Sequence, residues 1–251
     1  MTDALTASAS DRAMLAGAQL FRTLEPTDVE PVLAHFTIRD LPSGARIFEQ
    51  GDTDVDEMYV VLSGRIAITR HVDDIRRRSQ IIGPGETFGE LSVLDPGPRE
   101  RTAWALTPVR LATISRADYI AWALARPHVA ERLLRVLARR LRRTDDEALD
   151  LLFVDVGARL ARTLVDLAAR FGQSTNAGIS VEHGFSQSQL AEIVGTSRET
   201  LNKQLSGFIE RGWITAGRGR FLLKDPERLE TRARVGGTTV PPNRVSTDQR
   251  P

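Results

Sequence analysis

The sequence predicts an α+β fold: a small β roll, then one long helix, then a helix-turn-helix with a β hairpin beside it. Three observations predict this order. Short apolar runs alternate with Gly and Pro between residues 21 and 114, residues 129–152 contain neither Gly nor Pro, and two helix-capping patterns surround Gly195. A length of 251 residues exceeds one average domain, so two domains are expected.

Each part of the chain has its own pattern. Both ends lack hydrophobic periodicity and are rich in polar residues and turn formers, so they are predicted to be mobile tails. The predicted organisation is an N-terminal tail at 1–15, a β-roll domain at 16–127, a dimerisation helix at 128–154, a winged helix-turn-helix at 155–230 and a disordered C-terminal tail at 231–251.

Short helices are predicted on both sides of the β strands. Thr27 and Glu30 have the spacing of a capping box before an apolar pair, and a second helix is expected to begin near Ser115, with Asp118 in its first turn.

Composition excludes several classes of protein. The chain has no cysteine, which removes disulfides, thiolate nucleophiles and iron-sulfur clusters. The four histidines have no paired spacing, so neither a metal site nor a haem is expected. No apolar run approaches the roughly 18 residues of a membrane span, and the N-terminus lacks the basic start of a secretory signal. We therefore expect a cytoplasmic protein without a membrane partner.

The long helix is predicted over Val129–Leu152, about 24 residues and roughly 36 Å at the α-helical rise. Small and apolar side chains recur along it at steps of four and three: Ala130, Leu134, Leu137, Leu141, Thr144, Ala148 and Leu152. This spacing is typical of a seam between two helices, so we expect a homodimer through residues 129–152. The alternative is that the same face packs on the β roll of its own chain.

Residues 185–214 carry the strongest functional pattern. Ser186 with Gln189 and Thr196 with Glu199 have capping-box spacing, and Gly195 separates the two predicted helices. Apolar residues of the second helix face a core, whereas its other side carries long polar side chains that can reach base edges: Arg198, Glu199, Asn202 and Lys203. A hairpin with Arg218 and Arg220 at its tip follows and suits phosphate contact.

The segment Gly195-Thr196-Ser197-Arg198-Glu199-Thr200-Leu201-Asn202-Lys203 resembles the recognition segment of the cyclic-AMP receptor protein (CRP/FNR) family of bacterial transcription regulators. The resemblance implies that Arg198, Glu199 and Lys203 read bases, with Ser197 and Thr200 near phosphates. It further implies a palindromic DNA operator with half-sites related to TGTGA and RNA polymerase as a partner. It also implies a cyclic-nucleotide-binding-type roll in the N-terminal half.

In that half, Phe88-Gly89-Glu90-Leu91-Ser92 followed by Arg99 resembles the phosphate-binding cassette of the family. Gly89 allows close approach of the backbone, Glu90 can accept from a ribose hydroxyl, and Arg99 can neutralise a cyclic phosphate. The resemblance therefore implies cyclic AMP as the ligand, held by Gly89, Glu90, Leu91 and Arg99.

The chain also departs from the family pattern. Glu100 stands where nucleotide-binding members carry a small or hydroxylated residue, followed by Arg101 and Thr102, which could take over the phosphate-facing role. Thr144 matches a residue that contacts adenine in the family, but Asp145 replaces a neutral neighbour. Three alternatives therefore stay open: cyclic AMP, another nucleotide such as cyclic di-GMP, and no ligand, with Arg99 in a structural ion pair.

A cupin-like metabolite-binding or enzymatic β barrel is the alternative from a different class of protein. Cupin chemistry needs clustered histidines, which the chain lacks. The sequence has no P-loop and no nucleophile with a matching base, so an enzyme is not expected.

Overall fold

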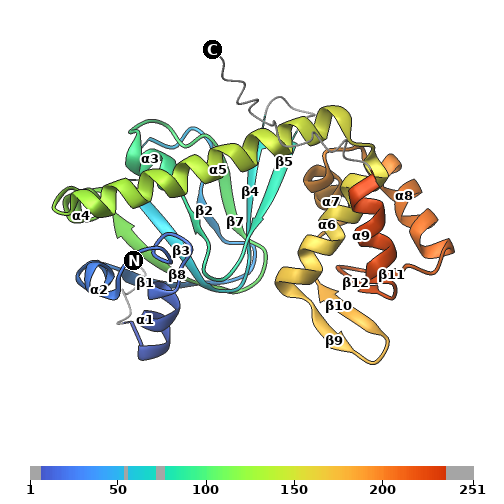
Figure 1. The fold of residues 1–251 in the computed structure, drawn as a ribbon, viewed down its shortest axis with the longest axis horizontal. Coiled ribbons are helices and arrows are strands. Elements are labelled where there is room, and N and C mark those ends of the chain that lie inside the picture. The colour runs from blue at the N-terminus through green and yellow to red at the C-terminus, as the bar shows by residue number, and fades with distance from the viewer. Residues whose placement is uncertain (1–6, 54–55, 72–76, 236–251) are drawn as a thin grey trace, which may run out of the picture. The chain divides into compact units, whose positions relative to one another are not determined.

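The computed structural model describes residues 7–53, 56–71 and 77–235, without the side chains of 77–78, 140, 143–153 and 235. The chain divides into two compact units (Figure 1). The first unit contains residues 1–144 and 184–197, and the second contains 145–183 and 198–251.

The first unit contains the predicted β roll, built from two four-stranded antiparallel sheets. The strand orders are β1-β8-β3-β6 and β2-β7-β4-β5. The strands are β1 (Thr37–Leu41), β2 (Arg46–Phe48), β3 (Glu57–Ser63), β4 (Ile66–His71), β5 (Arg77–Ile82), β6 (Thr87–Phe88), β7 (Thr102–Ala105) and β8 (Val109–Ser115). The mixed fold with this roll confirms the predicted fold class.

Alternate residues of the strands fill the interior of the roll, as the period of two in a strand requires. Ile66 and Ile68 of β4 join the same buried cluster as Phe48, Tyr59 and Phe88. The rings of Tyr59 and Phe88 are stacked with centroids 4.9 Å apart, and both lie 6.0 Å from the ring of Phe48.

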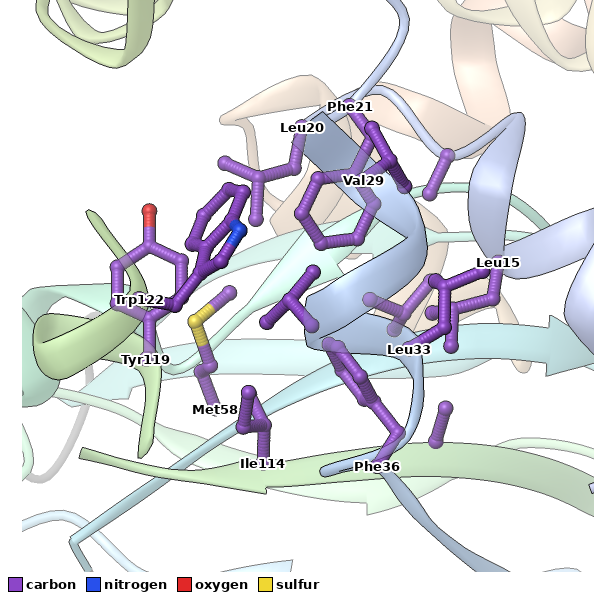
Figure 2. Packing of buried hydrophobic residues seen from close by; sticks show 14 of the residues in the cluster. Leu15, Leu20, Phe21, Val29, Leu33, Phe36, Met58, Ile114, Tyr119 and Trp122 are labelled. Atoms are coloured by element: carbon purple, nitrogen blue, oxygen red, sulfur yellow. The ribbon is translucent and has the colours of Figure 1, made fainter. Parts of the chain in front are cut away.

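Helices cover one side of the roll: α1 (Ala9–Ala16), α2 (Pro26–Leu33), α3 (Glu90–Leu94) and α4 (Arg116–Leu124). They bury a second apolar cluster, in which Trp122 and Phe21 meet edge to face at 5.7 Å (Figure 2). Trp122 Nε1 donates to the carbonyl of Asp28 at 2.8 Å, so its one polar atom is paired. Met58 of β3 and Ile114 of β8 belong to the same cluster, which ties the helices to the sheet β1-β8-β3-β6.

The prediction of a mobile N-terminal tail is wrong for its last residues, because α1 begins at Ala9. Leu15 is buried, and Asp11 forms a two-pronged ion pair with Arg110 of β8, both bonds at 3.0 Å. Residues 1–6 lie outside the described part. Sequence periodicity did not show this helix because its anchor lies 99 residues away along the chain.

One of the two caps predicted around the roll is present. Ser115 caps α4 by accepting from the amide of Asp118, as predicted. Thr27 does not cap α2, which begins at Pro26 with Glu25 before it. Proline suits the first helical position because its missing N–H has no intrahelical partner there.

The long helix α5 spans Pro127–Phe153, 27 residues, slightly more than predicted. Its first turns belong to the first unit, where Val129 and Leu133, 0% and 7% exposed, join the same apolar cluster as the other helices. Leu134 and Leu141 of the predicted seam are 65% and 63% exposed. At these two positions the seam is not covered by the roll of the same chain.

The second unit contains α6 (Val156–Phe171), α8 (Arg198–Glu210) and α9 (Pro226–Val235). Its sheet has the order β11-β12-β10-β9, with β9 (Gln173–Thr175), β10 (Gly178–Glu182), β11 (Ile214–Gly217) and β12 (Arg220–Leu223). The prediction of a disordered tail from residue 231 is wrong as far as Val235, because α9 continues to that residue and buries Leu229 and Ala233. Residues 236–251 lie outside the described part.

Within the described residues, no helix is both long and apolar enough to cross a membrane.

Candidate ligand and DNA sites

Gly89 sets the geometry of the candidate ligand site at the junction of β6 and α3. Its φ of 77° lies in the left-handed region, which glycine adopts without the steric cost of a side chain. A Cβ here would lie 3.1 Å from Arg99 Nη1 and 3.2 Å from Tyr59 Cδ2. The turn therefore brings the start of α3 close to Arg99.

Arg99 is the central group of this site. It is 3% exposed, and its guanidinium lies 4.4 Å from the centroid of the Phe48 ring. Nη1 donates to the carbonyl of Gly89 at 2.8 Å and Nη2 to the carbonyl of Glu57 at 2.6 Å. Nε is buried without a hydrogen-bond partner among the described residues.

No carboxylate of the described residues is hydrogen-bonded to Arg99. Across the described part of the chain, its side-chain hydrogen bonds go only to the two carbonyls. Burial lowers the pKa of Arg99, with the charges of Tyr59, Glu57 and two aspartates opposing that shift. A buried cation is costly unless an anion pairs with it, so the site has the electrostatics of an anion-binding site.

The loop after β2 fixes the direction of Arg99. Gly51 N donates to the carbonyl of Arg99 at 2.7 Å, and Arg99 N donates to the carbonyl of Asp52 at 2.8 Å. Gln50 N donates to Thr102 Oγ1 at 3.0 Å. Arg99 is consequently buried whereas Glu100, the next residue, is exposed.

The other predicted ligand residues differ in how far their side chains are exposed. Glu90 is buried at the start of α3, and Leu91 is 52% exposed. Arg101 is half-buried, and the side chains of Thr144 and Asp145 lie outside the described part. Sequence reasoning missed Glu57 and Phe48, because the first acts through its backbone carbonyl and the second through the face of its ring.

The first helix of the helix-turn-helix, α7 (Gln187–Val194), carries the predicted capping box of Ser186 and Gln189. It ends at Gly195, whose φ of 72° is left-handed, and Thr196 N donates back to the carbonyl of Ala191 at 3.0 Å. Because α8 begins at Arg198, Ser197 rather than the predicted Thr196 immediately precedes it.

The two sides of α8 match most of the prediction. Leu201, Leu205 and Phe208 are buried, whereas Arg198, Glu199 and Lys203 are exposed. Asn202 differs from the expectation of a DNA-facing residue, because it is half-buried and its Oδ1 is buried without a hydrogen-bond partner among the described residues. Thr200 is also half-buried, and Ser197 is exposed.

The predicted hairpin is present as β11 and β12, which pair antiparallel from Ile214↔Leu223 to Gly217↔Arg220. Arg218 and Arg220 are exposed at its turn, as predicted. Phe208 of α8 packs on Trp213 with ring centroids 5.3 Å apart, so the hairpin begins against α8. No group of three or more histidines and acidic residues suited to a metal ion occurs in the part of the chain that the structure describes.

Comparisons with known proteins find a separate match for each of the two candidate sites. A cyclic nucleotide-binding domain matches residues 38–124, and a Crp-like helix-turn-helix domain matches residues 158–232. The CRP-like cAMP-activated global transcriptional regulator of Mycobacterium tuberculosis is 41% identical over 222 residues, covering 88% of this chain and 99% of the relative. The chain belongs to the CRP/FNR family.

Other CRP/FNR proteins agree with this assignment. The cyclic AMP receptor protein of Thermus thermophilus is 37% identical over 216 residues, covering 85% of this chain and 96% of the relative. The structure of the c-di-GMP responsive global regulator CLP of Xanthomonas campestris is similar with a TM-score of 0.67 and 29% identity, over 79% of this chain and 99% of that one. The chain is thus a DNA-binding transcription regulator of the CRP/FNR type and not an enzyme, and the cupin-like alternative is rejected.

Proposed function

We propose that this regulator binds one cyclic mononucleotide, cyclic AMP, in the β roll, with Arg99 facing the phosphate and Glu90 the ribose. The observation that carries the proposal is the burial of Arg99 at 3% exposure, with its side-chain hydrogen bonds among the described residues going to two carbonyls. A phosphate supplies the anion that offsets the cost of burying this cation.

The number of buried cations favours a mononucleotide over cyclic di-GMP. Arg99 is the one buried arginine or lysine among the described residues, and it matches one phosphate rather than two. Glu100 stands where nucleotide-binding members carry a small or hydroxylated residue, and its carboxylate could repel the phosphate. Because Glu100 is exposed, that repulsion is weaker than it would be for a carboxylate buried beside the phosphate. The names of two relatives, cAMP-activated regulator and cyclic AMP receptor protein, support the same ligand.

Titration calorimetry at fixed salt with cyclic AMP, cyclic GMP and cyclic di-GMP tests this proposal. We expect cyclic AMP to bind most tightly to the wild-type chain and to lose that affinity in Arg99→Gln. Arg46→Gln, at an exposed arginine on β2, is the matched control and should bind normally. Loss in Arg101→Gln but not in Arg99→Gln would assign the phosphate to Arg101, and tighter binding of cyclic di-GMP would reject a mononucleotide.

We further propose a homodimer through residues 129–152. Exposure of Leu134 and Leu141, seven residues apart on α5, supports a helix-to-helix seam. Sedimentation velocity on Leu134→Glu should show monomers. Leu124→Glu, at a leucine of α4 that is 72% exposed, should remain a dimer and serves as the control. Equal behaviour of the two variants would contradict the seam.

In such a dimer, two recognition helices would enter successive major grooves about 34 Å apart on a palindromic operator. Arg198, Glu199 and Lys203 would read bases, whereas Ser197, Thr200, Arg218 and Arg220 would contact phosphates. A coupling of about 1–3 kcal/mol would let cyclic AMP change operator affinity 5- to 150-fold. The bound dimer would recruit RNA polymerase in the cytoplasm.

Fluorescence anisotropy on a palindromic TGTGA-type duplex, with and without cyclic AMP, tests operator binding. Salt must be held constant because phosphate contacts make the affinity steeply salt-dependent. Tighter binding with cyclic AMP supports the regulated form of the proposal. Tight binding that cyclic AMP leaves unchanged supports constitutive recognition, and no preference over a scrambled duplex would reject this operator.

A further inference from the structure

Arg232 lies near the C-terminal end of α9, in a segment that the sequence predicted to be disordered. Its guanidinium forms two hydrogen bonds with the carboxylate of Asp155, Nη2 to Oδ1 at 2.5 Å and Nη1 to Oδ2 at 3.1 Å. Asp155 lies in the short break between α5 and α6. The last helix is thus bonded to the point where α6 begins.

Asp155 has two roles at this point. Its Oδ1 also accepts from the amide of Ala158 at 3.1 Å, which caps α6. Hydrogen bonding to Arg232 lowers the pKa of Asp155, which favours the charged carboxylate that the ion pair needs. One side chain therefore both starts α6 and holds α9.

Gly157 brings the recognition helix into the same junction. A Cβ at this position would lie 2.8 Å from Arg232 Nη2 and 2.8 Å from Gln204 Oε1 of α8. Both side chains therefore end over the bare backbone of Gly157. Gln204 directly follows Lys203 but lies about 100° further around α8, so the junction supports this helix away from its proposed DNA-reading side.

A second hydrogen bond joins α9 to α6. Arg162 of α6 donates through Nη2 to the carbonyl of Ala233 at 3.3 Å. Leu229 and Ala233 of α9 are buried. The last turn of α9 is therefore fixed to α6 by polar and apolar contacts that flank Arg232.

We propose that Arg232 is a positioning residue for DNA recognition, which through Asp155 and Gly157 fixes α8 relative to the start of α6. The inference rests on the proposed operator binding. It assigns to α9 a part in sequence discrimination without any contact between α9 and DNA. Without Arg232, α8 would remain folded but would present its base-reading side chains in a less defined orientation.

The test compares the affinity of the full chain for the TGTGA-type duplex with its affinity for a scrambled duplex at the same salt concentration. Arg232→Ala and Asp155→Asn should each lower operator affinity about 3- to 10-fold and leave affinity for the scrambled duplex unchanged. Asparagine is an equally good N-cap, so Asp155→Asn removes the ion pair and keeps the cap. Arg232→Lys should restore part of the ratio.

Gly157→Ala distinguishes an effect on positioning from an effect on stability, because the two quantities are expected to change in opposite directions. Alanine at a compatible helical position ordinarily stabilises a protein by about 0.4–1 kcal/mol. The new methyl group would lie 2.8 Å from the side-chain ends of Arg232 and Gln204 and 3.2 Å from Asp155 Oδ1, and the two longer side chains are flexible enough at their ends to move aside. The unfolding temperature should therefore stay or rise while the ratio of operator to scrambled affinity falls.

Arg234→Ala is the matched control, because Arg234 is an α9 arginine with an 82% exposed side chain that pairs with Glu230 of the same helix. It should leave the ratio unchanged. An unchanged ratio in both Arg232→Ala and Gly157→Ala, or an equal loss on both duplexes, would overturn the inference. A wild-type chain that does not prefer the operator would instead reject the proposed operator binding.

Discussion

The β roll buries its candidate ligand-binding cation, whereas the recognition helix exposes its cations to solvent. Arg99 is 3% exposed in the roll and donates to backbone carbonyls, whereas Arg198 and Lys203 of α8 are exposed. A buried cation is costly until an anion arrives, which makes it selective for a ligand of defined shape. An exposed cation attracts any phosphate at long range and adds selectivity only where its geometry fits a base edge.

The largest expected effect tests the buried side of this comparison. Arg99→Gln should lower cyclic AMP affinity by about 2–5 kcal/mol, because the phosphate would lose its buried charged partner. The same variant removes the cost of burying the charge, so the free energy of unfolding without ligand should not fall. Calorimetry and chemical denaturation measure the two quantities, and a large loss of stability without ligand would identify Arg99 as a structural residue.

A second buried charge in the first unit is expected to behave differently, because its partner is present. Asp11 is 7% exposed and bonds Arg110, which holds the pKa of Asp11 well below its usual range. Asp11→Asn should cost about 1.5–3 kcal/mol of unfolding free energy near pH 7, as for other hydrogen bonds between charged groups.

The pH dependence of this effect has a definite sign. A carboxylate whose folded-state pKa is lowered stabilises the fold fully above its unfolded pKa of about 3.9, and this contribution is lost as the pH falls further. The difference between wild type and Asp11→Asn, measured by denaturation, should therefore shrink below about pH 4. Asp40→Asn, at a 51% exposed carboxylate that also bonds Arg110, should show a smaller difference throughout.

The ion pair of Asp11 also shows which parts of the fold the sequence could predict. The caps at Ser115 and Ser186 and the apolar side of α8 depend on residues three or four apart, and all three are confirmed. The helices α1 and α9 were missed because their anchors are tertiary: Arg110 for Asp11 and Asp155 for Arg232.

The candidate ligand site shows the same limit. The sequence predicted Glu90 and Arg99 through a motif. The hydrogen-bond partners of Arg99 are the backbone carbonyls of Glu57 and Gly89. Every residue has such a carbonyl, so the residue type does not reveal these partners. Opposite exposure of Arg99 and Glu100 follows from the backbone pairing with Gly51 and Asp52, which only the folded loop reveals.

A third prediction tests the exposed side of the comparison at the base edges. Arg198→Ala should weaken operator binding by about 1–3 kcal/mol and relax the preference at one base pair, because arginine can pair bidentately with guanine. Anisotropy on a set of single-base operator variants measures this. Equal weakening on operator and scrambled duplexes would contradict base reading by Arg198.

The smallest effect is expected at the tip of the hairpin. Arg218 is exposed beside Gly219, whose φ of 69° makes the turn, at a place that suits contact with a phosphate rather than with a base edge. Arg218→Ala should therefore weaken operator and scrambled duplexes alike and reduce the slope of log affinity against log salt by about 1. Arg46→Ala in the roll is the control. It should leave the slope of log affinity against log salt unchanged, because the proposed phosphate contacts belong to the second unit. A selective loss on the operator in Arg218→Ala would instead show that the hairpin, like α8, discriminates sequence, and exposure alone would no longer separate phosphate contacts from base contacts.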